Sequence, residues 1–178
     1  MASYLEWNAA LADHVTGQLP QGSRVCLHVD ADVLGTLGRR HWPTGETICW
    51  QDVFLQALRE QLVDCGRVRL GALGYRDAAG RPLGVAFLGV LVLAAASASH
   101  GPRAPQRAAY LTRVCGFLGV PRNAAGRPPG FPAGAELPLW EDWNAYLHGL
   151  GLQPTASGGH GSHRFTTFPF SQLSGTRL

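Results

Sequence analysis

The stretch at residues 82–99, PLGVAFLGVLVLAAASAS, decides how the rest of the chain must fold. It runs for eighteen residues without a charged side chain, between Arg81 on one side and Arg103 a few residues beyond the other. Pro82 suits the first turn of a helix, and Gly89 is the one helix breaker between Val85 and Ala98. The sequence therefore predicts an apolar helix over residues 85–98.

A helix of this kind either spans a membrane or lies inside a protein core. Eighteen residues are near the lower limit of about 17–25 for a span. Residues 94–99 are small and weakly hydrophobic, and no second hydrophobic segment or aromatic belt accompanies them. Because a helix that is apolar on every side is otherwise enclosed by its neighbours, the sequence predicts burial and no contact with a membrane.

Four further segments have the apolar periodicity of helices that could cover the central one. They are residues 4–16, 48–65, 105–118 and 139–150. The first follows a capping box formed by Ser3 and Glu6, and Asp30 is placed to cap a short additional helix that ends near Gly38. The predicted fold class is mainly α, with about five or six helices around a buried central helix at residues 85–98.

A minor β element and two irregular segments complete the expected single domain of residues 1–178. Strand-like sequence occurs at residues 24–29, 67–73 and 164–168, and we expect the last to pair with the first. The second is either part of a short hairpin or an extended crossing. Residues 121–138 hold five of the twelve prolines and predict a surface loop, which we call the proline loop, whereas residues 155–162 have the composition of a Gly/Ser linker.

The composition is typical of a globular protein and excludes several kinds of chemistry. Hydrophobic residues make up 46% of the 178 residues, and the net charge is +3, which is too small for a global field that drives tight nucleic-acid or membrane binding. All fifteen basic residues are arginine. Without lysine, this chain cannot form a Schiff base or a P-loop nucleotide site.

The four cysteines and the N-terminus indicate a cytoplasmic protein. Cys26, Cys49, Cys65 and Cys115 are widely spaced and form no CxxC pair. The first fifteen residues carry an acid early and lack the basic-then-apolar order of a signal peptide. Reduced, mostly buried thiols and no cofactor are therefore expected.

No catalytic residue and no metal ligand is predicted with any preference. Asp30 and Asp32 form a D-x-D pair after a strand-like segment, but helix capping explains Asp30 better than a metal site. His160 and His163 have metal-like spacing but lie in or beside the Gly/Ser-rich segment, which offers no rigid support. A small metal-dependent enzyme that uses the aspartates and histidines is kept as an alternative.

A second alternative is contact with nucleic acid through Arg39, Arg40 and Trp42. These residues lie in a predicted loop and combine two guanidinium groups with an indole, the groups that contact phosphates and stack on bases. Arg122 and Arg127 in the proline loop are a weaker candidate of the same kind.

The favoured hypothesis is a non-catalytic protein-interaction or assembly module. The candidate surface consists of the proline loop, which is either an interaction loop or a segment fixed by Phe131, and of the aromatic helix that carries Trp140. Its partners would be other protein subunits or the remainder of a larger chain.

The order of the segments also resembles a group of bacterial proteins. The matching segments are SYLEWNAALADHV, RVCLHVDADVL, VAFLGVLVLAAA, YLTRVCGFLGV, LWEDWNAYL and HRFTTFPFSQ. In this order they resemble the N-terminal region of large uncharacterised bacterial proteins that look like components of phage-defence gene clusters. The resemblance implies an N-terminal recognition or assembly module of a longer protein. It assigns no catalytic residue, because the matching positions are packing positions.

Overall fold

A computed structural model describes residues 2–44, 47–98 and 107–154. These residues form a mainly helical structure with two small sheets, which confirms the predicted fold class. The helices are α1 (Tyr4–Thr16), α2 (Ala31–His41), α3 (Trp50–Leu62), α4 (Val85–Ala98), α5 (Arg107–Leu118) and α6 (Leu137–Gly149), with a 3-10 helix η1 at Gly71–Gly74. The strands are β1 (Arg24–Val25), β2 (Val63–Asp64), β3 (Arg67–Val68) and β4 (Gln153–Pro154).

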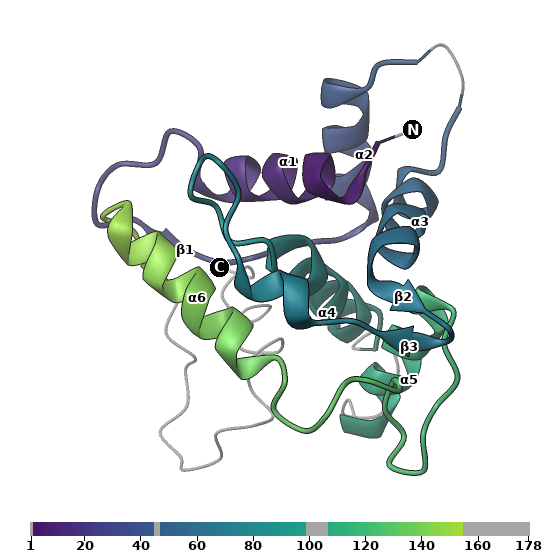
Figure 1. The fold of residues 1–178 in the computed structure, drawn as a ribbon. Coiled ribbons are helices and arrows are strands. Elements are labelled where there is room, and N and C mark those ends of the chain that lie inside the picture. Colours follow the sequence, from purple (N-terminus) through teal and green to yellow (C-terminus); the bar gives the residue numbers. More distant parts are fainter. Residues whose placement is uncertain (1, 45–46, 99–106, 155–178) are drawn as a thin grey trace.

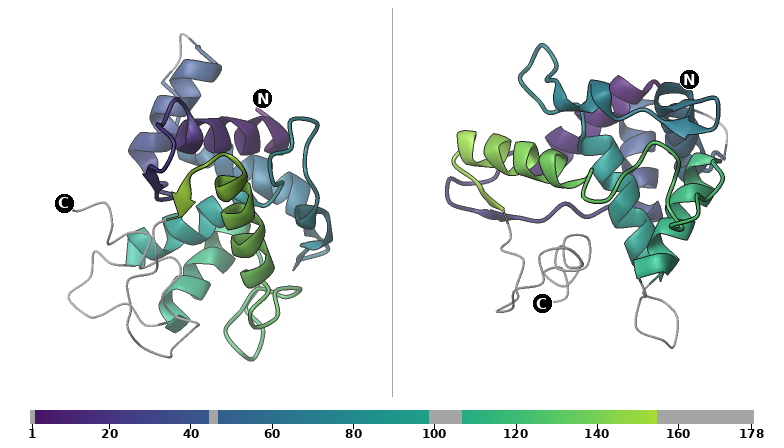
Figure 2. Two further views of the ribbon diagram at one scale, coloured as in Figure 1. Left: turned by 90° about the vertical axis from the view of Figure 1, so that its left-hand side faces the viewer. Right: turned by 60° about the horizontal axis from the view of Figure 1, so that its bottom comes forward.

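The predicted central helix is α4, and it occupies the middle of the core (Figure 1). Every residue from 85 to 95 is buried. Helices α1, α3, α5 and α6 all contact it, and the two further views in Figure 2 show it enclosed from several sides. None of the helices in the described ranges combines the length and apolar character needed to cross a membrane.

A buried asparagine of α1 fixes the start of α4. Asn8 is only 1% exposed. Its Nδ2 donates to the carbonyl of Pro82 at 2.8 Å, and its Oδ1 accepts the N–H of Ala86 at 2.9 Å. Because the first N–H groups of a helix have no partner within it, this side chain satisfies a polar group that would otherwise be buried alone. The predicted capping box of α1 is also present, with Glu6 N 3.3 Å from Ser3 Oγ.

Helix α2 begins at its predicted cap but continues past its predicted end. Asp30 accepts the N–H of Val33 at 2.8 Å, as expected of an N-cap. Gly38 does not stop the helix, because its role is packing: a Cβ added there would lie 2.0 Å from Trp50 Cδ2. Residues 39–41, expected in a loop, therefore form the last turn of α2.

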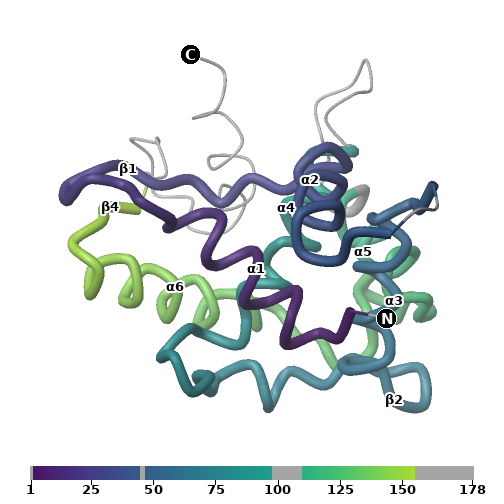
Figure 3. The backbone as a smooth tube through the Cα atoms, turned by 90° about the horizontal axis from the view of Figure 1, so that it is seen from above, coloured from purple at the N-terminus to yellow at the C-terminus, as the bar shows by residue number. Residues whose placement is uncertain are grey.

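The β elements are shorter than predicted. Within residues 24–29, β1 covers Arg24–Val25 and pairs in parallel with β4 (Figure 3). Residues 67–73 divide into β3, which forms a hairpin with β2, and the 3-10 helix η1, so the hairpin alternative is correct. Residues 155–162 and 164–168, the predicted linker and pairing strand, lie outside the described residues.

The proline loop is held against the hairpin and α4. Val68 N donates to the carbonyl of Pro129 at 2.7 Å. Gly130 has φ +83, and a Cβ added to it would lie 2.3 Å from the Val68 carbonyl oxygen, so only glycine fits. The ring of Phe131 packs edge-on against that of Phe87 in α4, with centroids 5.8 Å apart. Phe131 therefore fixes this loop on the core, as one of the two alternatives expected.

We expect Asn8→Ala to lower the free energy of unfolding by roughly 2–4 kcal/mol, because it leaves the Pro82 carbonyl and the Ala86 N–H buried without partners. Chemical denaturation measures this change. The matched control is Asn144→Ala on α6, because Asn144 is half-buried and its Oδ1 has no hydrogen-bond partner. A loss for Asn8→Ala no larger than that for the control would contradict the role given to Asn8.

Candidate functional site

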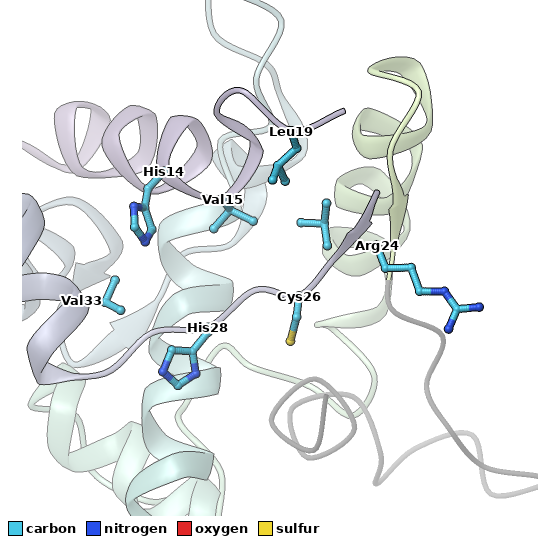
Figure 4. A pocket seen from close by; sticks show the side chains of 8 residues that line it. His14, Val15, Leu19, Arg24, Cys26, His28 and Val33 are labelled. Atoms are coloured by element: carbon cyan, nitrogen blue, oxygen red, sulfur yellow. The ribbon is translucent and has the colours of Figure 1, made fainter. Parts of the chain in front are cut away.

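A pocket of about 240 Å³ lies between the end of α1, the turn that follows it and the segment that begins with β1 (Figure 4). Its lining residues are His14, Val15, Leu19, Arg24, Val25, Cys26, His28 and Val33. The extended backbone explains this lining, since successive side chains point to opposite sides. Leu27 and Val29 are buried in the core, whereas Cys26 and His28, which alternate with them, face the pocket.

His28 and Asp30 form the closest polar pair at this pocket. His28 Nε2 lies 2.8 Å from Asp30 Oδ2. Partial burial works to raise the pKa of Asp30, but hydrogen bonds from the Val33 N–H and from His28 outweigh it and hold the pKa below its usual range. The other imidazole nitrogen of His28, Nδ1, is buried and has no hydrogen-bond partner. The pair therefore braces the start of α2.

The pocket does not have the arrangement of an active nucleophile or a metal centre. Burial raises the pKa of the Cys26 thiol, so it lacks the thiolate character that a nucleophilic cysteine requires. Asp32 lies exposed in the first turn of α2. Over residues 2–44, 47–98 and 107–154, no three His, Cys, Asp or Glu side chains are grouped so that they could hold a metal ion. His160 and His163 lie outside these ranges.

The residues predicted to contact nucleic acid lie at the end of α2. Arg39 and Arg40 are exposed in its last turn, where positive charge complements the helix dipole. Trp42 is half-buried, and its ring centroid lies 4.6 Å from that of Trp7 and 6.1 Å from that of Trp50. The structure thus brings the three residues together, but it uses the indole for core packing.

The two residues predicted to form a protein-contacting surface are in the core. Phe131 is 1% exposed and Trp140 is 0% exposed. This corrects the expectation that they present an aromatic surface. The physical reason is that Phe131 anchors the proline loop on α4, while Trp140 lies on the face of α6 that is turned to the core.

Sequence reasoning missed a second pocket, between the β2–β3 hairpin and the proline loop. It has a volume of about 460 Å³. Its lining residues are Arg67, Asn123, Ala125, Arg127, Gly130, Phe131, Pro132 and Ala133. One sequence signal points to this region, because no acidic residue occurs between Asp77 and Glu136, whereas six arginines do.

Comparison of the chain with protein-family models, with curated proteins and with solved structures found no match. The function must therefore be argued from the geometry of this chain alone.

We expect the pKa of His14 to rise towards its ordinary value of about 6.5 in Arg40→Gln. Partial burial lowers this pKa, and the charges of Arg40 and His28 lower it further. The measurement is an NMR titration of the imidazole. Arg24→Gln is the control, because Arg24 lines the same pocket but extends away from His14 (Figure 4).

The sign of the stability effect follows from the lowered pKa. Above about pH 6.5 the imidazole is neutral in both states, and its contribution to stability is fully present. As the pH falls through the window below 6.5, the unfolded chain binds the proton more readily, and stability is lost. A pKa of His14 above about 6.5, or an equal change in both variants, would contradict this assignment.

Proposed function

We propose that the protein is a non-catalytic assembly module that binds an acidic surface of a partner protein. The binding surface in this proposal is the arginine surface, which we define as Arg67 of β3 with Arg122 and Arg127 of the proline loop. It replaces the buried aromatic residues as the candidate contact surface.

The observation that carries the proposal is that these arginines have no acidic partner. Three other arginines are paired with carboxylates: Arg69 with Asp64, Arg76 with Asp142, and Arg81 with both Asp13 and Asp77. By contrast, the described residues supply no carboxylate to Arg67, Arg122 or Arg127. A guanidinium group matches a carboxylate through two parallel hydrogen bonds, so the surface is suited to an acidic partner.

The surface is also held in place before a partner arrives. Val68 N donates a hydrogen bond to the Pro129 carbonyl at 2.7 Å, and Gly130 lies close against the Val68 carbonyl, so the hairpin is fixed to the loop next to Arg67. Preorganisation of this kind reduces the entropy lost on binding.

Two features favour a protein partner over nucleic acid. Single-stranded binding uses exposed aromatic rings as stacking platforms, and the one aromatic residue that lines the loop pocket, Phe131, is buried. Tight duplex binding typically involves about 6–10 phosphate contacts, more than this surface offers. Contact with nucleic acid through Arg39 and Arg40 stays a prediction, without a stacking role for Trp42.

The resemblance to components of phage-defence gene clusters suggests where such a module would act and what it would bind. In that setting the module would lie in the bacterial cytoplasm, and its partner would be another subunit or the remainder of a larger chain. The positive charge of the arginine surface supports an association of this kind but does not depend on it.

The test is affinity capture from a host-cell extract with three forms of the protein. We expect the wild type to retain a partner that is released by about 0.5 M NaCl, where charges are strongly screened. Arg122→Gln/Arg127→Gln should retain at least about fivefold less. Arg39→Gln/Arg40→Gln is the matched control, because it removes the same charge from a different surface. Equal capture by both double variants, or a partner consisting of nucleic acid, would contradict the proposal.

A further inference from the structure

The pocket between the hairpin and the proline loop presents hydrogen-bond donors and no side-chain acceptor. Arg67 and Arg127 have no acceptor atoms, and within the described part of the chain neither side chain makes a hydrogen bond or an ion pair. Asn123 is the third polar residue of the lining. Its Oδ1 already accepts the N–H of Ala125 at 2.9 Å and that of Arg127 at 3.0 Å. Its amide NH₂ group is therefore what it can offer to a ligand.

The backbone of the pocket is held by hydrogen bonds, and part of its wall is apolar. Asn123 N donates to the Arg127 carbonyl at 2.8 Å, and Gly126 N donates to the Asn123 carbonyl at 2.9 Å, so residues 123–127 form a closed turn. Phe131, Pro132 and Ala133 form an apolar part of the wall. The volume of about 460 Å³ falls in the range of about 300–1,000 Å³ that is usual for small ligands and their groups.

We propose that this pocket binds the phosphate group of a phosphorylated side chain, presented by the partner protein. The inference rests on the proposed function for the identity of the presenter, but its chemistry rests on the pocket. Two guanidinium charges match the charge of a phosphate monoester, about −1.5 to −2 at neutral pH, whereas a carboxylate would neutralise one of them. The monoester oxygens accept hydrogen bonds from both arginines and from the Asn123 amide, and the apolar wall contacts the group that carries the phosphate.

The experiment titrates the ¹⁵N-labelled protein with phenyl phosphate at constant ionic strength. We expect saturable shifts of the Asn123 side-chain amide and of the backbone amides of residues 123–131. Arg67→Gln and Arg127→Gln should each weaken binding about tenfold, because each removes a charge-assisted hydrogen bond. Arg113→Gln is the matched control, because Arg113 is exposed on α5 and does not line the pocket. We expect less than a twofold effect there.

Measuring binding at two pH values distinguishes recognition of phosphate from a general preference for anions. The second pKa of a phosphate monoester is about 6, so phenyl phosphate should bind several-fold more weakly at pH 5.5 than at pH 7.5. Benzenesulfonate keeps one charge throughout and should bind weakly and equally at both values. Equal binding of the two compounds at pH 7.5, or absence of saturable binding, would overturn the inference. So would an unphosphorylated oligonucleotide that binds the same residues more tightly, since this would favour phosphodiesters.

The two proposals fail separately. If phenyl phosphate does not bind but partner capture still depends on Arg122 and Arg127, the phosphate inference is overturned and the assembly module stands. If phenyl phosphate binds as described but no partner is captured, the pocket assignment is supported and the assembly proposal falls.

Discussion

A helix without a polar face must be enclosed on all sides, and this constraint organises the whole structure. From residue 85 to residue 95, α4 is buried completely, so α1, α3, α5 and α6 each have to supply an apolar face to it. Because the N-terminal end of α4 is enclosed as well, its first N–H groups would be buried without hydrogen-bond partners. The side chain of Asn8 on α1 accepts a hydrogen bond from the Ala86 N–H and donates one to the Pro82 carbonyl. One buried amide thus couples the first helix to the central one.

The same constraint determines which residues remain for recognition. The aromatic side chains expected to make contacts are used for packing: Phe131 packs on Phe87, Trp140 is fully buried, and Trp42 packs on Trp7. Aromatic residues are the usual anchors of protein interfaces, but these three pack in or against the core. The proline loop contributes charge to the surface, carried by arginines that no carboxylate in the described part of the chain neutralises. Recognition through this loop is accordingly proposed to be electrostatic, with the aromatic residues setting the position of the loop.

The helices could be predicted from the sequence because their signals are local. Apolar periodicity, the Ser3–Glu6 box and the Asp30 cap depend on residues a few positions apart. The end of α2 was misplaced because Gly38 serves a contact with Trp50 of α3, which no local pattern reveals. Likewise, Phe131 in a proline-rich segment gives no local sign of whether it binds a partner or the core. The pocket of Arg67 and Arg127 joins residues sixty positions apart, and only the fold brings them together.

Amide hydrogen exchange at α4 tests most directly whether this helix is the cooperative core. If it is, the amides of residues 88–93 exchange only when the whole protein unfolds. Their exchange free energies should then equal the free energy of unfolding from denaturant and should be the highest in the molecule. Exchange of these amides by local opening, at free energies below those of α1 and α3, would show that the chain is not organised around α4.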